Sequence, residues 1–437
     1  MKKALFFLAL FVQSAFVMSQ VSVKEIDLDY GSHSVGFKHY ITSDQTRTYQ
    51  RKMDWGTESI ARPISISLWF PATKKESSTK LSLLNYMRIL KQEEEWDFLP
   101  DEQLLNWFAY ANTPQNRKHL TEKTFAFFDT SPVNEKFPVI IYAPSYEASS
   151  IENFALCEYL ASHGYLVIST SSKGTEGRWI GKETLKGIET QARDLEFLLQ
   201  EVSKMKNADR EKIATMGFSL GGLSNVLLQM KNTSIRAIVS LDGSIRYNYQ
   251  TLKKSAYENI QKVNVPFIHM AQKEIPEAIL KSDKINPELN YKFEFYDKLV
   301  YSDAYKLRFH DLTHLNFSSL DILFRKRDPR QDKSDQKIMR SYKLVSKYSL
   351  QFLNGYLKND QKAIAFLKQP TSSELISKEF KLAKKVSFNF RDFHELVKKQ
   401  NYQDLLDLYA SIQSKHPKFK IQEGQLNQYR ITIDFQP

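Results

Sequence analysis

Short apolar runs alternate with longer amphipathic stretches along the middle of the chain, and this alternation predicts an α/β fold. Strands that regular helices separate predict a mostly parallel sheet with helices on both faces, whose functional side chains gather at the carboxyl ends of the strands. The apolar runs that predict buried strands lie at residues 138–142, 165–168, 213–216, 237–241, 265–270 and 305–309. Amphipathic helical spacing is clearest at residues 188–202 and 338–357.

The N-terminal third departs from this regular order. Residues 64–70 alternate between two faces and predict a strand that Pro71 ends. Residues 73–135 lack a strand pattern and instead carry helical clusters rich in aromatic residues, among them Trp107. An insertion of this length ahead of a core strand predicts a lid or a wall of a substrate site, with a purely structural helical decoration as the alternative.

The two ends of the chain predict segments outside the main domain. Lys2 and Lys3 precede a short apolar run and then small residues, which predicts a signal peptide over residues 1–19 with cleavage between Ser19 and Gln20. We therefore expect an exported protein, periplasmic or extracellular. An α/β domain over residues 20–357 would follow, and residues 358–437 predict a helical appendage.

The charge balance bears on possible partners. The chain has 62 Lys and Arg against 50 Asp and Glu, a net charge of +12 that falls to +10 when a signal peptide with Lys2 and Lys3 is removed. Such a protein can contact anionic surfaces of the cell envelope. The basic residues are scattered, without the interleaved aromatics of a nucleic-acid-binding stripe. The single cysteine, Cys157, excludes an internal disulfide, and its apolar neighbours predict a buried, unreactive thiol.

A G-x-S-x-G sequence around Ser219 is the strongest chemical signal. Residues 217–222 read GFSLGG, directly between a predicted buried strand and a predicted helix. In a nucleophile elbow this order of elements exposes the serine hydroxyl and directs the N–H of the next residue, here Leu220, toward a developing oxyanion. The alternative is a glycine-rich turn that contains a serine by chance.

A serine nucleophile needs a histidine base and a carboxylate that orients it. His310 and His314 both follow the last predicted strand, and we favour His314 because a polar and aromatic helix start follows it. For the acid, Asp242 at the end of the strand after the elbow is favoured over Glu274, which follows the next strand. The pair His310 and His314 also resembles a two-histidine metal motif, but zinc helices of that kind carry Glu beside the first histidine.

These residues together resemble α/β-hydrolases of the platelet-activating factor acetylhydrolase type and their bacterial dienelactone-hydrolase-like relatives. The resemblance implies Ser219 as nucleophile, His314 as general base and Asp242 as its orienting acid. It also implies oxyanion donors at the N–H groups of Leu220 and Tyr146. We expect a reaction without a metal or organic cofactor. The resemblance spans about residues 35–357 and rests on residues 62–63, 68–72, 217–222, 241–242 and 314–317.

One stretch departs from the family pattern. Where these enzymes usually have His-Gly ahead of the second oxyanion donor, this chain has Pro144-Ser145. Proline lacks an N–H and stiffens the loop, so the position of the Tyr146 donor is open.

The sequence therefore predicts an exported serine hydrolase that cleaves carboxylic esters, such as acetyl or short-chain lipid esters, through an acyl-serine intermediate. Trp107 and Phe218 are the predicted contacts of the substrate. The alternatives are peptide, lactone or sugar-acetyl cleavage on the same triad, and a catalytically weak binding or scaffold protein.

Overall fold

The computed structural model describes residues 21–53, 55–176, 180–282, 284–371, 373–384, 393, 396, 397, 405–417 and 419–421. The predicted signal peptide and its cleavage site lie outside these residues. The strands are β1 (Ser34–Met53), β2 (Gly56–Lys74), β3 (Lys80–Ser82), β4 (Lys123–Phe127), β5 (Thr130–Pro132), β6 (Phe137–Ala143), β7 (Leu166–Ser169), β8 (Ala208–Phe218), β9 (Ile235–Leu241), β10 (Phe267–Ala271), β11 (Ala304–Phe309) and β12 (Ile376–Lys381).

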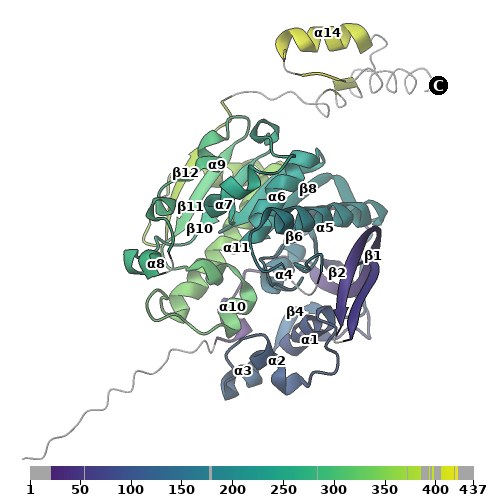
Figure 1. Cartoon of the computed structure of the whole chain (residues 1–437), viewed down its shortest axis with the longest axis vertical. Coiled ribbons are helices and arrows are strands. Elements are labelled where there is room, and N and C mark those ends of the chain that lie inside the picture. The colour runs from purple at the N-terminus through teal and green to yellow at the C-terminus, as the bar shows by residue number, and fades with distance from the viewer. Residues whose placement is uncertain are drawn as a thin grey trace, which may run out of the picture.

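Helices connect these strands and cover the sheet (Figure 1). They are α1 (Leu83–Glu93), α2 (Leu104–Trp107), α3 (Pro114–His119), α4 (Phe154–Ser162), α5 (Leu185–Lys204), α6 (Leu220–Lys231), α7 (Ile245–Leu252), α8 (Glu277–Ser282), α9 (Glu294–Lys298), α10 (Ser319–Phe324), α11 (Asp335–Leu357), α12 (Gln361–Lys368) and α14 (Leu405–Lys415). Among the described residues, no helix is both long and apolar enough to cross a lipid bilayer.

The strands form one sheet in the order β12-β11-β10-β9-β8-β6-β7-β2-β1-β4-β3, with β5 paired to β2. Every contact from β7 through β6, β8, β9 and β10 to β11 is parallel, whereas β2, β1 and β12 join antiparallel. The predicted mostly parallel sheet is confirmed for its centre. The carboxyl ends of its parallel strands lie on the same side of the sheet. The three predicted triad residues follow β8, β9 and β11 on that side.

Helices lie on both faces of the sheet because successive core residues of a strand point to opposite sides. In β6, Ile140 belongs to the hydrophobic cluster that contains Tyr342 of α11. The next residue, Ile141, belongs to the cluster that contains Leu195 of α5 and Leu227 of α6. Cys157 is buried in α4 as a free thiol, as predicted.

Four details of the sequence-based prediction are wrong. Pro71 does not end its strand, since β2 continues to Lys74 and Pro71 pairs with Val35 of β1. The insertion at residues 73–135 holds helices α1–α3 but also the short strands β3, β4 and β5. A long strand, β1, precedes β2 and was not predicted. The domain does not end at residue 357, because β12 pairs with β11 at the edge of the sheet.

The described residues beyond β12 form a unit of their own. The buried residues of α14 pack with Phe393 and Phe419 in a separate small hydrophobic cluster. Figure 1 draws α14 apart from the sheet. Helix α14 lies in the predicted helical appendage, and residues 393, 396 and 397, which are also described, are helical.

Candidate active site

Ser219 stands in a strained turn between β8 and α6. Its φ of 51° and ψ of −117° lie outside the regions that a serine ordinarily adopts, a cost of about 1–3 kcal/mol. Gly221 lets the turn approach β6 closely, because a Cβ there would stand 2.0 Å from the Ala143 carbonyl oxygen. The predicted order of strand, elbow and helix is confirmed, with Leu220 as the first residue of α6.

The structure brings the three predicted triad residues together from three separate loops. His314 Nε2 lies 3.1 Å from Ser219 Oγ, and His314 Nδ1 lies 2.7 Å from Asp242 Oδ2. His314 begins a short 3₁₀-helix, His314–Phe317, after β11, and Asp242 follows β9 directly. These distances allow a proton to pass from the serine to the imidazole while the carboxylate holds the ring.

Asp242 is fully buried and its charge is well supported. Its Oδ1 accepts hydrogen bonds from the backbone N–H of Gln272 at 3.1 Å and from the Tyr247 hydroxyl at 3.3 Å. Burial raises the pKa of Asp242, but the hydrogen bond and charge of His314 outweigh it, so that the pKa lies below its usual range. The carboxylate therefore stays ionised beside the imidazole.

The same pair acts in the opposite direction on the histidine. Burial lowers the pKa of His314, yet the hydrogen bond and the negative charge of Asp242 raise it further, to a value above the ordinary 6.5. One third of the side chain is exposed, so that solvent still reaches the ring. Phe218 packs against the other side, with the ring centroids 4.9 Å apart. The imidazole is thereby fixed in one orientation.

The alternative site residues lie elsewhere. Glu274 is exposed to solvent and accepts a hydrogen bond from the Tyr291 hydroxyl. Together with His310 it lines a cavity that is different from the one at Ser219. His310 and His314 thus open into separate cavities. Within the described residues, no group of three or more His, Cys, Asp or Glu side chains is arranged to hold a metal ion.

A cavity of about 240 Å³ opens at Ser219. Its wall mixes apolar and charged side chains, which suits a small ester with polar ends. It is lined by Leu90, Phe108, Ala109, Tyr110, Ser145, Tyr146, Glu147, Ala148, Ser149, Glu152, Phe218, Ser219, His314, Leu315, Leu320, Asp321 and Arg325.

The insertion contributes to this wall, but not through the predicted residue. Trp107 is 54% exposed and does not line the cavity. It packs edge-on against Trp96, while its neighbour Phe108 and the nearby Tyr110 face the cavity. The sequence could not separate these aromatics, because α2 is only one turn long and ends at Trp107. Phe218, the other predicted contact of the substrate, does line the cavity.

The loop that carries the second predicted oxyanion donor is held on one side by Glu152. This carboxylate accepts hydrogen bonds from the Ser145 N–H at 3.0 Å, from the Ser145 hydroxyl and from the Tyr142 hydroxyl at 3.0 Å. Burial raises the pKa of Glu152 to about 7, although its hydrogen bonds with Ser145 lower it. The Glu152 carbonyl oxygen also accepts the Leu320 N–H of α10, which follows His314. Sequence reasoning did not find Glu152.

The same loop is held on its other side by residues of α5 and the segment before it. Gln191 donates to the Pro144 carbonyl at 2.9 Å, and the Ser172 hydroxyl donates to the Ser145 carbonyl. With both carbonyls and the Ser145 N–H bound, the Pro144-Ser145 stretch has a defined place. The next residue, Tyr146, lines the cavity with Ser219.

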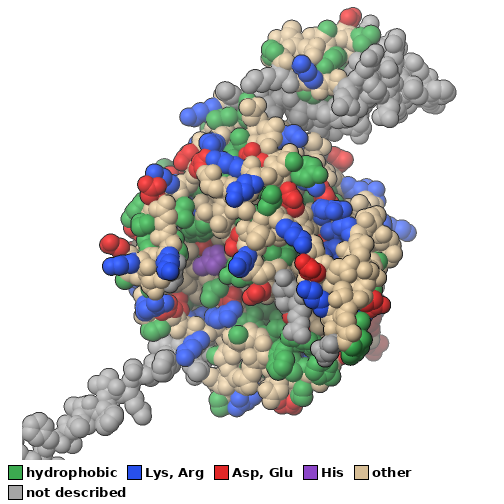
Figure 2. All heavy atoms as spheres, viewed as in Figure 1, with side chains coloured by type: hydrophobic (Ala, Val, Ile, Leu, Met, Phe, Trp, Pro, Cys, Tyr) green, Lys and Arg blue, Asp and Glu red, His purple; other side chains and the backbone are tan. Residues whose placement is uncertain are grey.

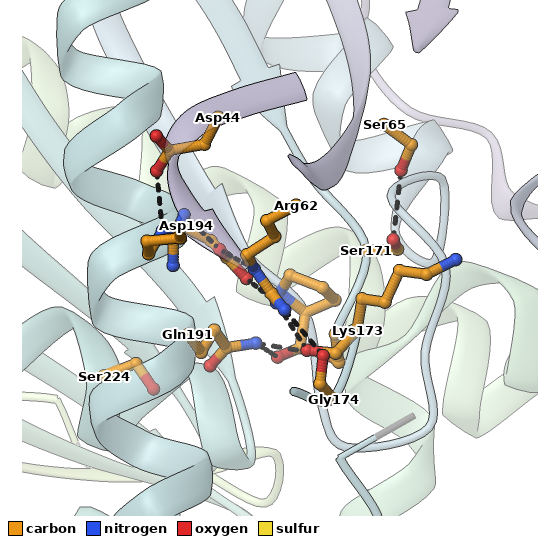
Figure 3. A network of polar contacts seen from close by, with 12 residues as sticks. Asp44, Arg62, Ser65, Ser171, Lys173, Gly174, Gln191, Asp194 and Ser224 are labelled. Atoms are coloured by element: carbon orange, nitrogen blue, oxygen red, sulfur yellow. Dashed lines mark hydrogen bonds and ion pairs between the residues drawn. The ribbon is translucent and has the colours of Figure 1, made fainter. Parts of the chain in front are cut away.

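Arg62 anchors the segment that contributes Ser172 (Figure 3). The guanidinium is buried, donates to both carboxylate oxygens of Asp194 at 2.6–2.7 Å, and reaches the carbonyls of Lys173 and Gly174. A bidentate arginine of this kind fixes geometry as well as charge. Arg62 is one of the residues on which the sequence resemblance rests. In the structure it holds the Lys173-Gly174 segment in place against Asp194.

Comparisons with known proteins agree with this architecture. Residues 125–305 match the sequence profile of the dienelactone hydrolase family. Over these residues the chain is similar to the dienelactone hydrolase family, and its fold is of the α/β-hydrolase type. A solved structure of the ferulic acid esterase from Streptomyces cinnamoneus is similar in fold, with a TM-score of 0.55 at 16% identity, over 84% of this chain and 99% of that chain. No curated protein matches the sequence.

The similarity to this family supports a reaction class for the chain, the hydrolysis of carboxylic esters. Its ester substrate is a small molecule, which agrees with the size of the cavity at Ser219. The family match ends at residue 305, so that His314 and the whole of β12 lie beyond it.

Proposed function

We propose that this hydrolase is an exported serine esterase that cleaves small carboxylic esters through an acyl-serine intermediate. The observation that carries the proposal is the unbroken hydrogen-bonded path from Ser219 through His314 to Asp242, with the serine in a strained elbow. A glycine-rich turn that contained a serine by chance would not be expected to have either the strained backbone or the hydrogen-bonded path.

The first half of the reaction forms the acyl-enzyme. Ser219 Oγ attacks the ester carbonyl carbon while His314 Nε2 takes its proton, and Asp242 stabilises the imidazolium that results. The N–H groups of Leu220 and Tyr146 stabilise the oxyanion of the tetrahedral intermediate. His314 then protonates the departing alcohol, and Ser219 keeps the acyl group.

In the second half, water takes the place of the alcohol. His314 removes a proton from the water as its oxygen attacks the acyl carbon, and it returns that proton to Ser219 Oγ as the carboxylic acid leaves. Each half uses the same contacts of His314, at 3.1 Å and 2.7 Å.

The cavity favours a short acyl group, such as acetyl, or the short chain of a lipid ester. Its volume of about 240 Å³ is below the range of about 300–1,000 Å³ that is usual for ligand sites, and Phe108 and Tyr110 are among the apolar residues of its wall. Arg325 adds a cation to the same wall, held by Asp321 at 2.9 Å. A lactone is the second candidate, because the matching family is named for a lactone substrate.

The test combines covalent labelling with a panel of nitrophenyl esters of increasing acyl length, a lactone and methyl ferulate. A fluorophosphonate should label the wild type and fail to label Ser219→Ala. His314→Ala should lower kcat/KM by about 10⁴-fold or more, whereas His310→Ala should leave it within about twofold. Asp242→Asn should be far more damaging than Glu274→Gln. Labelling that persists in Ser219→Ala would refute the acyl-serine mechanism.

Export rests on the sequence of residues 1–19 and has its own test. The mature protein, recovered from the periplasm or the medium, should begin at Gln20 when its N-terminus is sequenced. Its basic character would allow contact with anionic envelope material, although Figure 2 shows Lys and Arg interspersed with Asp and Glu on the visible face. Recovery of an uncleaved chain from the cytoplasm would contradict export.

A further inference from the structure

A second cavity, of about 360 Å³, lies along β11 and β12 near the end of β10, and none of the three triad residues lines it. Three cationic side chains, those of Arg246, Lys306 and Arg308, lie in its wall. It is lined by Arg246, Ala271, Glu274, Asn290, Tyr291, Lys306, Leu307, Arg308, His310, Ser377 and Glu379. His310, which the proposed reaction does not use, belongs to this wall.

Two arginines in this cavity converge on one backbone oxygen. Arg246, from α7, is 6% exposed and donates to the Leu289 carbonyl at 3.0 Å and to the Asn290 carbonyl at 2.5 Å. Arg308, from β11, donates to the same Asn290 carbonyl. In the part of the chain that the structure describes, neither guanidinium has a carboxylate within ion-pair distance. Arg246 is buried and Arg308 is half-buried, and bringing two cations this close without a counter-ion is costly.

The carboxylates of the cavity contact other residues of its wall, not the two arginines. Glu379 pairs with Lys306 at 2.9 Å, and Glu274 accepts the Tyr291 hydroxyl. Burial and the neighbouring charge of Arg246 lower the pKa of Arg308, even though Glu274 acts in the other direction. The wall around the two guanidiniums therefore has an excess of positive charge.

We propose that this cavity binds a small oxyanion group, a phosphate, sulfate or carboxylate, between Arg246 and Arg308. A guanidinium presents its N–H groups in a planar fork that matches a pair of oxygens on such a group. Five donors on each arginine exceed what two carbonyl oxygens can accept, so donors remain for a ligand. Lys306 and His310 line the same space, although Lys306 is already paired with Glu379.

The site is separate from the proposed reaction but close to its acid. Arg246 lies four residues after Asp242, and the next residue of α7, Tyr247, donates its hydroxyl to Asp242. Binding is best measured in the Ser219→Ala protein, because turnover then plays no part. Failure of the anion site would leave the proposed esterase function untouched, and the reverse also holds.

The test is calorimetric titration of the full-length Ser219→Ala protein with inorganic phosphate, at constant ionic strength set by sodium chloride. We expect saturable binding near one equivalent, weakened at least tenfold by Arg308→Gln. Arg210→Gln removes an equal charge at an exposed position near the start of β8, and it should change the affinity less than twofold. Sulfate and acetate titrations then distinguish a tetrahedral oxyanion from a carboxylate as the preferred group.

Arg308→Lys guards against loss of the fold in Arg308→Gln. It keeps the charge but not the planar fork, so that we expect binding weakened by about three- to fivefold. Absence of saturable phosphate, sulfate and acetate binding in the parent protein would overturn the proposal, and would leave the arginines as anchors of the Asn290 carbonyl. Equal weakening by Arg308→Gln and Arg210→Gln would also overturn it, since the effect would then be one of net charge.

Discussion

At the scale of single residues, the pKa of His314 has the clearest consequence for function. The imidazole accepts a proton from Ser219 only in its neutral form. Since Asp242 raises its pKa above the ordinary 6.5 in spite of burial, the neutral fraction falls as the pH drops through that raised value. The carboxylate thus improves the orientation of the base but narrows the pH range in which it works.

We therefore predict that kcat/KM of the wild type falls toward acid pH with a midpoint above 6.5. In Asp242→Asn the charge is gone while burial remains, so the pKa of His314 should drop below that of the wild type. The titration of the His314 ring, followed by NMR in both proteins, measures this directly. A midpoint that stays unchanged in Asp242→Asn would mean that another group controls the acid limb.

Glu152 is the residue whose importance the sequence concealed. Its partner Ser145 lies seven residues earlier, and a glutamate just ahead of a helix resembles any other polar residue of a loop. The triad, in contrast, was predictable, because elbow, strand end and helix start each leave a local pattern. Only the fold brings Glu152 under the Pro144-Ser145 loop, where its carboxylate binds one N–H and one hydroxyl of Ser145.

Glu152→Gln should lower kcat about tenfold with little change in KM, because Glu152 orients the loop of the Tyr146 donor and is not itself a donor. Loss of an entire oxyanion donor costs more, about 10²–10³-fold. The measurement is steady-state kinetics on a nitrophenyl ester, with the exposed Glu135→Gln as a control that should match the wild type. A change confined to KM would place Glu152 among substrate contacts.

The same variant should also change how stability depends on pH. Folding raises the pKa of Glu152 from 4.5 to about 7, so the folded chain binds this proton more tightly than the unfolded chain. The contribution of Glu152 to stability thus decreases as the pH rises from 4.5 to about 7. The Tm of Glu152→Gln relative to the wild type should accordingly be higher at pH 8 than at pH 5.

At the scale of elements, the pattern of hydrophobic residues predicts the central strands of the sheet but not the strands near its edges. The strands of the parallel centre are buried on both faces and carry continuous apolar runs, which made them predictable. In β1, polar residues occupy most positions on both faces, and only its pairing with β2 makes a strand of it. In β12 a single residue, Ile376, is fully buried, so no apolar run marks it.

Within the insertion, the neighbours Phe108 and Trp107 offer a matched pair of variants. Phe108 lines the cavity at Ser219, whereas Trp107 is 54% exposed and outside it. Phe108→Ala should shift the relative kcat/KM between short and long acyl esters by about tenfold, which corresponds to about 1.4 kcal/mol of differential binding. Trp107→Ala should shift it by less than about twofold. The reverse ranking would mean that the substrate enters across the outer face of α2.

At the scale of the whole molecule, the boundary of the catalytic domain lies after β12 instead of at residue 357. Six residues of β12 pair with β11, and Leu375 accepts the His310 N–H four residues ahead of His314. Leu367 of α12 is completely buried, so that this helix too belongs to the core. Two further hydrogen bonds, from the N–H groups of Ala383 and Lys384, tie the chain to the segment before β11.

A chain that ends at Lys384 keeps all of these contacts, and α14 and its separate small cluster lie beyond it. We predict that this shortened protein retains kcat/KM within about twofold and a Tm within about 2 °C of the full chain. A chain that ends at Leu357 should instead aggregate or lose activity, because it exposes the edge of β11 and the apolar face beneath α12. Thermal denaturation and ester hydrolysis of the two truncations measure both effects. Full activity in the chain ending at Leu357 would show that β12 is dispensable for placing His314. Loss of activity in the chain ending at Lys384 would show that the C-terminal unit completes the site.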